Sequence, residues 1–417
     1  MRAERFAGRG RAYGPLMTVI STGSTTATSS SGRAARPAGA VRPARPARPV
    51  VSELRLAAFA SHRRAVIPLG PLTLLAGGSG AGKSTALCGY EALARLAAGD
   101  PLEDVFPDPV AWVPERAGAD AQGRRGFRLG CTVEGPAGPV RLELAVQAEP
   151  TLRIVGERLS DGGATLLSTA LRDPGRSAVQ AAWHTAGAVP VTRAPFPDDR
   201  LGTALLPLRV AGTTEGELRV LAAAEQAVVA LRSAFLCDPQ PRRMRAAVPV
   251  GEGRLTSSCD NLAEVLYRTH GQCAQRHARL VASAHTGCAG QVTGLTVERL
   301  ADGRVQARTE RGPGHSTPLG RLGDGELRYL AFALVLLTGP HVLVVDPAAE
   351  VPSAMQSLTV LADGFDRSLD ARQRGELLAL ATSICAAGHT RLLATVTEAT
   401  AASARGTEGV TVVDLAP

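Results

Sequence analysis

Lys83 is the only lysine in a chain of 417 residues whose other basic side chains are all arginines. It lies in the stretch GGSGAGKST, where Gly77, Gly82, Lys83 and Ser84 satisfy the pattern G-x-x-x-x-G-K-S/T. In such a loop, backbone N–H groups surround phosphate oxygens and the lysine ammonium reaches the β- and γ-phosphates. A compact ammonium on a flexible stem suits that space better than the wide planar fork of an arginine. The stretch therefore predicts a site for a nucleoside triphosphate.

The elements on either side of this loop must position it. Residues 72–76 are typical of a buried strand, and the apolar periodicity of residues 84–97 predicts a helix. The N-terminus of a helix attracts anions through its unpaired N–H groups and its dipole. The residues expected to bind ATP are Gly77, Gly78, Ser79, Gly80, Ala81, Gly82, Lys83, Ser84 and Thr85. The hydroxyl of Ser84 is also expected to bind Mg²⁺.

A second element with a carboxylate is needed to hold the magnesium ion. The run HVLVVD predicts a strand over residues 341–346, and we expect its terminal Asp346 to hold Mg²⁺ beside Ser84. A buried strand that ends in Asp-Pro is also compatible with an ordinary turn. The predicted strand lies more than 250 residues after Lys83. This spacing is longer than expected for a ring-forming motor ATPase or a small-molecule kinase.

The segment LGDGELRYLAFALVLL, directly before this strand, predicts a helix over residues 326–338 with a glycine-rich start. It resembles the signature motif of ABC-class ATPases, in particular the SMC/RecF/OLD-like AAA-domain group. The resemblance covers most of residues 51–417 and implies an ATP-dependent homodimer, in which the signature of one copy faces the γ-phosphate held by the other. The residues that would make this contact are Gly323, Asp324, Gly325 and Glu326. A simple helix cap is the alternative for them.

The chain departs from this family at the residues that would hydrolyse ATP. Pro347 follows Asp346 where the family has a glutamate that activates water, which leaves Glu350 as the candidate for that role. The family's switch histidine is also missing, with Thr397 near its place. Loss of a general base costs ~10²–10⁴ in rate and leaves phosphate binding nearly intact. We therefore expect Mg-ATP binding with slow hydrolysis, in which the phosphate-binding lysine and Glu350 act as catalytic residues.

Two other functions remain open. A nucleotide-gated scaffold without hydrolysis would fit the missing glutamate. A P-loop phosphotransferase acting on a small molecule would need an arginine-rich lid and no signature helix, so the segment LGDGELR counts against it.

The net charge of +8 comes from the first 50 residues, which hold nine arginines and one acidic residue. The remaining chain balances 37 basic against 37 acidic residues. The tail is rich in Ser, Arg and Pro and poor in large apolar residues, which predicts disorder. Nucleic acid stays open as a partner, through this tail or through two arginine clusters over residues 124–128 and 242–245. The charge balance of the body does not indicate it.

Cysteine usage and hydropathy indicate the compartment. The seven cysteines form no CxxC pair, which is typical of reduced thiols. No apolar stretch approaches the ~20 residues that span a bilayer. The strong preference for arginine over lysine suggests a GC-rich bacterial genome. We expect a cytoplasmic bacterial protein without membrane contact.

The predicted fold is an α/β P-loop NTPase core of the ABC/RecF-like kind, interrupted by an α+β lobe. The expected divisions are a disordered tail over residues 1–50, core over 51–100, lobe over 101–310 and core over 311–417. The sequence SLD at residues 368–370 resembles the dimer-contact loop of the family. It lies farther from Asp346 than in transporters of this class.

Overall fold

The computed structural model describes residues 48–186, 191–345, 347–348 and 351–416. The glycine-rich loop follows a strand of a five-stranded sheet with the order β10, β14, β15, β3, β16, in which every neighbouring pair is parallel. Its strands are β3 Leu72–Ala76, β10 Ala234–Cys237, β14 Leu358–Ala362, β15 Thr390–Thr395 and β16 Val410–Asp414. Because the carboxyl ends of parallel strands meet at one edge, the loops after β3, β14 and β15 come together there.

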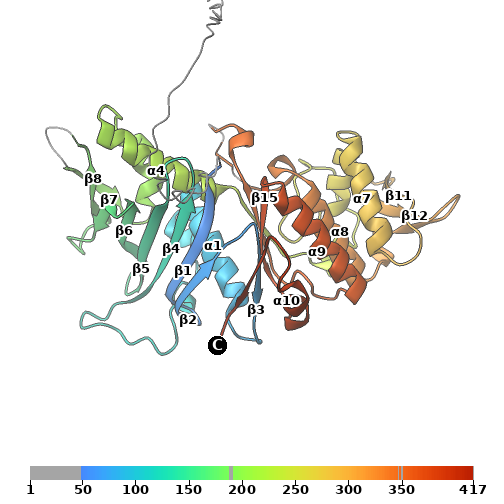
Figure 1. Ribbon diagram of the computed structural model, residues 1–417, viewed down its shortest axis with the longest axis horizontal. Helices are drawn as coiled ribbons and strands as arrows, with labels where there is room; N and C mark the ends of the chain where they lie inside the picture. The colour runs from blue at the N-terminus through green and yellow to red at the C-terminus, as the bar shows by residue number, and fades with distance from the viewer. Residues whose placement is uncertain (1–47, 187–190, 346, 349–350, 417) are drawn as a thin grey trace, which may run out of the picture. The chain divides into compact units, whose positions relative to one another are not determined.

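Helices cover both faces of this parallel sheet, as a fully buried sheet requires. Helix α1 (Lys83–Ala98) packs on one face, and helices α8 (Asp324–Leu337) and α9 (Ala371–Ala386) pack on the other (Figure 1). Side chains of the strands alternate between the two faces. Leu75 joins the hydrophobic cluster that contains α1, whereas Leu74 joins the cluster that contains α8 and α9.

A second sheet of eight antiparallel strands has the order β2, β1, β4, β5, β6, β7, β8, β9. Its strands are β1 Val50–Phe59, β2 His62–Pro68, β4 Arg125–Glu134, β5 Val140–Glu149, β6 Arg153–Asp161, β7 Ala164–Ala170, β8 Ala178–His184 and β9 Val191–Pro197. One face packs against helix α4 (Glu215–Arg232) and α1 in a shared core (Figure 1). The alternation of buried Phe127 and Leu129 with exposed Arg128 shows the two faces of β4.

A third sheet and several further helices accompany the two large sheets. Helices α6 (Leu262–His270) and α7 (Ala274–Gly287) precede a three-stranded sheet. That sheet consists of β11 Gly294–Arg299, β12 Val305–Glu310 and β13 Ser316–Pro318. The short helices are α2 Leu102–Val105, α3 Gly202–Leu205, α5 Pro241–Met244 and α10 Glu398–Ala404. Among the described residues, no helix has the length and apolar character needed to cross a bilayer.

The two sheets do not follow the expected division into core and lobe. Strands β1 and β2, expected in the core, pair with the strands of the lobe, while β10 comes from the expected lobe and pairs with β14 in the parallel sheet. Arg391 of β15 connects the two sheets. Its Nη2 donates hydrogen bonds to the carbonyl oxygens of Val51, Leu69 and Gly70 at 3.3, 2.8 and 2.7 Å. Burial lowers the pKa of Arg391 from its ordinary value.

The prediction of a strand over residues 341–346 is wrong for those of these residues that the structure describes. Pro340–Val342 form a 3₁₀ turn, and Leu343 makes only an isolated bridge to Leu255. The preceding Gly339 and the proline break the extended run, and Val344 is 53% exposed. The apolar strand that enters the parallel sheet before an acidic residue is instead β14, whose five residues are all buried.

Candidate functional site

The loop between β3 and α1 has a backbone that only glycine adopts readily. Gly77, Gly80 and Gly82 have φ values of 138°, 82° and 85°. A Cβ on Gly77 would lie 2.4 Å from the carbonyl oxygen of Leu415, and one on Gly82 would lie 2.6 Å from the ring of His62. Gly77 and Gly82 are therefore required by both conformation and space, and Gly80 by conformation alone.

Helix α1 begins directly after this loop and its N-terminus carries no negative charge. Its N-cap is Gly82, which has no side chain to accept from the first N–H groups, and the first turn contains no acidic residue. The ammonium of Lys83 donates hydrogen bonds to the carbonyl oxygens of Gly77 at 2.7 Å and Gly78 at 2.8 Å, so it folds back over the loop. Free N–H groups, a helix dipole and an ammonium together favour an anion at this point.

Asp363 follows β14 and faces the start of α1. Ser84 Oγ donates to Asp363 Oδ1 at 2.9 Å, and Thr395 Oγ1 of the neighbouring strand β15 donates to the same oxygen at 2.7 Å. A hydroxyl and a carboxylate are oxygen ligands of the kind that Mg²⁺ takes. The thiol of Cys88 lies close by. Burial raises its pKa to about 11, with added contributions from Glu91 and Asp363, so it stays protonated at neutral pH.

Asp363 was missed in the sequence, where Asp346 was predicted to hold the metal. Asp346 and Glu350 lie outside the described residues. The signal was present in the spacing, because the SLD segment at residues 368–370 is too far from Asp346 but begins five residues after Asp363. When Asp363 takes the place predicted for Asp346, the residue to compare with the water-activating glutamate is Gly364 instead of Pro347.

The loop after Asp363 contains a second, buried carboxylate. Asp366 is 5% exposed and its Oδ2 accepts hydrogen bonds from the Thr397 N–H at 2.9 Å and from the hydroxyls of Thr397 and Thr400. Three donors satisfy this oxygen and fix the loop to the residues after β15. Thr397, which stands near the place expected for a histidine, is therefore a structural partner of Asp366.

These loops line an open cavity of about 740 Å³. The cavity is lined from the glycine-rich loop by Gly77, Ser79, Gly80, Ala81, Gly82, Lys83, Ser84 and Thr85. From the other two loops it is lined by Asp363, Gly364, Asp366, Arg367, Thr395, Val396, Thr397 and Glu398. Glu398 is ion-paired with Arg405 at 2.7 Å. Of the residues predicted from Gly77 to Thr85, all except Gly78 line this cavity, together with carboxylates and an arginine, Arg367, that the sequence analysis did not assign to the site.

The predicted signature residues lie elsewhere in the chain, at the N-terminus of α8. Glu326 accepts hydrogen bonds from the N–H groups of Gly323 and Ala289, both at 2.8 Å. Arg245, from one of the arginine clusters, pairs with Asp324 at 2.8 Å. A Cβ on Gly325 would lie 2.3 Å from the carbonyl oxygen of Ser368, so the signature segment packs against the SLD loop of its own chain. These four residues do not line the cavity around Lys83.

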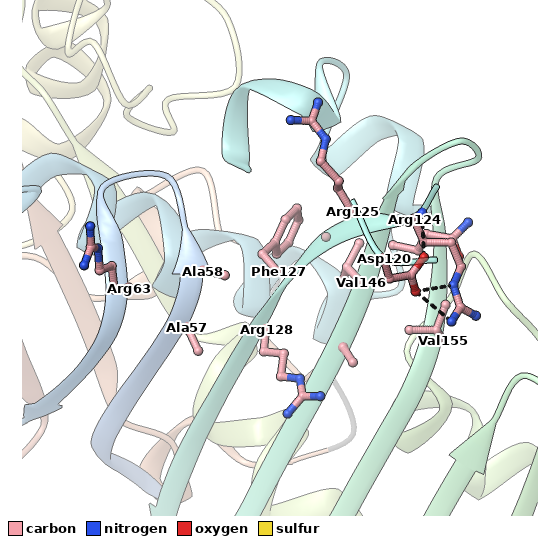
Figure 2. Close-up of a pocket in the computed structure, with 13 residues that line it drawn as sticks. Ala57, Ala58, Arg63, Asp120, Arg124, Arg125, Phe127, Arg128, Val146 and Val155 are labelled. Atoms are coloured by element: carbon pink, nitrogen blue, oxygen red, sulfur yellow. Dashed lines mark hydrogen bonds and ion pairs between the residues drawn. The ribbon is translucent and has the colours of Figure 1, made fainter. Parts of the chain in front are cut away.

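The other arginine cluster lies on the outer face of the antiparallel sheet. It borders a hollow of about 540 Å³. Asp120 pairs with Arg124 and Glu149 with Arg125, so two of the positive charges are compensated. Arg63, Arg125 and Arg128 point in different directions around the hollow (Figure 2). The guanidinium groups therefore do not converge on a single small anion.

Comparison with models of known protein families finds no match, and comparison with curated proteins finds none either. Solved structures give three examples of similarity. An Smc head bound to the C-winged helix domain of ScpA has 12% identity and a TM-score of 0.46, covering 83% of this chain and 90% of that chain. An SMC head domain from Thermotoga maritima has 13% identity and a TM-score of 0.39, covering 86% of this chain and 92% of that chain. An Smc head domain with an extended coiled coil, bound to the C-terminal domain of ScpA derived from Pyrococcus furiosus, has 10% identity and a TM-score of 0.43. It covers 84% of this chain and 90% of that chain.

Proposed function

We propose that this chain is an ATP-binding P-loop protein of the ABC/SMC/RecF-like kind, which holds Mg-ATP in the cavity around Lys83. The observation that carries the proposal is the glycine cradle at the start of α1, where added Cβ atoms at Gly77 and Gly82 would collide with neighbouring atoms. A nucleotide fits this cradle because its phosphates would meet free N–H groups and the only lysine of the chain.

Each residue has a separate role in this proposal. The loop over residues 77–82 supplies backbone N–H groups, Lys83 supplies a cation for the β- and γ-phosphates, and the hydroxyl of Ser84 and the carboxylate of Asp363 hold Mg²⁺. The hydrogen bond between Ser84 and Asp363 places these two ligands side by side. Bound magnesium would neutralise part of the phosphate charge.

The residues around Asp363 support slow hydrolysis. Gly364 has no side chain that can accept a proton, Thr397 is engaged with Asp366, and Glu398 is paired with Arg405. Among the described residues that line the cavity we therefore identify no positioned base, and loss of a base lowers the rate by ~10²–10⁴ while binding is largely retained. The same observation favours a second candidate function, a nucleotide-gated scaffold that does not hydrolyse ATP.

Binding of Mg-ATP is the first test. Isothermal titration calorimetry of the full chain is expected to show magnesium-dependent binding of ATP, and Lys83→Ala is expected to weaken it at least about 100-fold, since a cation that pairs with two phosphates is lost. Arg219→Ala is a matched control, because Arg219 pairs with Asp161 on the antiparallel sheet. Absence of magnesium-dependent binding in the unaltered chain would sink the proposal.

Homodimerisation is a separate part of the proposal. Light scattering after size exclusion is expected to show a doubled mass with ATP and magnesium. Asp324→Arg is expected to remove the doubling, because an added bulky cation would stand beside Arg245 at the start of α8. A mass that does not respond to ATP would leave a monomeric ATP-binding protein.

A further inference from the structure

Gly364, the residue after Asp363, leaves room for a guanidinium group. Its φ is 59°, in the left-handed region that favours glycine. A Cβ on Gly364 would lie 2.7 Å from Nε and 2.9 Å from Cζ of Arg367. The space that a side chain at this position would need is therefore taken by Arg367.

Arg367 lies in the same cavity as Lys83 and is held loosely there. Its side chain is 56% exposed, and its nearest carboxylates are those of Asp363 at 3.8 Å and Asp238 at 3.9 Å. Both distances exceed a normal hydrogen bond, so the guanidinium makes no directed bond to either carboxylate. Asp238 is also shared with a second arginine, Arg328, at 3.5 Å.

The backbone beneath Arg367 is fixed, in contrast to its side chain. Arg328 of α8 is 2% exposed, and its Nη2 donates hydrogen bonds to the carbonyl oxygens of Asp363 at 2.9 Å and Gly364 at 2.7 Å. Burial lowers the pKa of Arg328, and the nearby positive charge of Arg367 lowers it further. An anion that draws Arg367 away from Arg328 would relieve this repulsion between like charges.

We propose that Arg367 is a second phosphate-binding cation of the site, specific for the terminal phosphate of a nucleoside triphosphate. The inference rests on the proposed binding of Mg-ATP. Magnesium held by Asp363 would offset the attraction between this carboxylate and Arg367, which leaves the guanidinium for an anion in the cavity. A guanidinium can bind two phosphate oxygens at once. The space beside Gly364 is thus occupied by the cation of Arg367, which would retain the triphosphate. A carboxylate in the same space would instead activate water for cleavage of the triphosphate.

The test compares the affinities of Mg-ATP and Mg-ADP by titration calorimetry. Arg367→Gln is expected to raise the Kd of Mg-ATP about 10-fold and to leave that of Mg-ADP within about twofold, because only ATP carries the terminal phosphate. Arg367→Lys is expected to recover part of the loss, since it keeps the charge without the fork. Arg219→Gln removes one positive charge far from Asp363 and is the matched control.

A second variant acts without removing the arginine. Gly364→Ala places a methyl group against the movable end of Arg367, and we expect the same selective loss of ATP affinity, with thermal unfolding used to confirm that the variant folds. Equal losses for ATP and ADP in Arg367→Gln, or no loss, would overturn the inference while binding sensitive to Lys83→Ala persists. Failure of the unaltered chain to bind either nucleotide would instead overturn the proposed function itself.

Discussion

Helices α1 and α8 both begin after a glycine, yet their N-termini differ in charge. At the start of α1, Gly82 is the cap, the first turn has no acidic residue and Lys83 adds a positive charge. At the start of α8, Glu326 already accepts from the N–H of Gly323, and Asp324 adds a second carboxylate. The N-terminal end of the helix dipole therefore favours an anion at α1, whereas at α8 two carboxylates already lie in the first turn.

The difference teaches that a glycine-rich helix start is not sufficient for phosphate binding. Side-chain charges within the first turn act at shorter range than the helix dipole and decide its effect on an anion. A phosphate that approached α8 would meet the carboxylates of Asp324 and Glu326 before the N–H groups. In the proposed homodimer, contact of these residues with nucleotide would require compensating cations, and Arg245 already pairs with Asp324.

The largest expected effect comes from giving α1 the charge of α8. Thr85→Glu introduces a carboxylate into the first turn of α1, inside the cavity that contains Lys83. We expect Mg-ATP affinity to fall at least about 100-fold by titration calorimetry, because like charges repel strongly in a partly buried site. Thr85→Gln has the same size without the charge and should lose less than about 10-fold. Equal losses would mean that side-chain volume, not charge, separates the two helix starts.

A smaller effect is expected at Asp363, whose carboxylate accepts a hydrogen bond from Ser84 of α1. Asp363→Asn should weaken ATP binding about 10- to 100-fold in the presence of magnesium, because an amide is a poorer ligand for Mg²⁺ than a carboxylate. In the presence of a chelator, the variant should bind ATP at least as well as the unaltered chain, since a repelling charge is gone. Asp346→Asn is the control and should change neither value. The opposite result, with Asp346 as the sensitive position, would restore the sequence-based prediction.

The smallest effect concerns the cap of α8. Glu326→Ala removes the acceptor of the Gly323 and Ala289 N–H groups, and we expect a loss of about 1 kcal/mol in the free energy of unfolding, measured with urea. Glu408→Ala is the matched control, since Glu408 is exposed and has no recorded ion pair among the described residues. If both variants lost the same stability, Glu326 would not be a structural cap. The acidic start of α8 would then be free to meet a ligand.

The elements that could be predicted from the sequence are those with local signals. The strand predicted over residues 72–76 matches β3, and helix α8 begins and ends within two residues of the bounds predicted for it. Glycine and proline near helix ends, and strict apolar periodicity, depend only on neighbouring residues. The role of each residue around Lys83 in binding nucleotide remains a prediction.

The acidic strand could not be chosen from apolar patterning alone, and the signal in the sequence that separates the two candidates is the SLD segment five residues after Asp363. HVLVVD and LTVLAD are both apolar runs that end in aspartate. What separates them in the structure is pairing with distant strands, because β14 lies between β10 and β15 in the sheet, whereas Leu343 makes a single bridge. Such long-range pairing overrides the preference of a short segment for one conformation. The membership of β1 and β2 in the antiparallel sheet was hidden for the same reason.

Arg391 sets a limit on how this protein can be divided. Its guanidinium group, on a strand of the parallel sheet, donates to one carbonyl group of β1 and to two carbonyl groups in the segment between β2 and β3. Separating the two sheets would break these hydrogen bonds and expose to water the apolar core that both sheets share around α1, which is costly. We therefore expect the two sheets to unfold together.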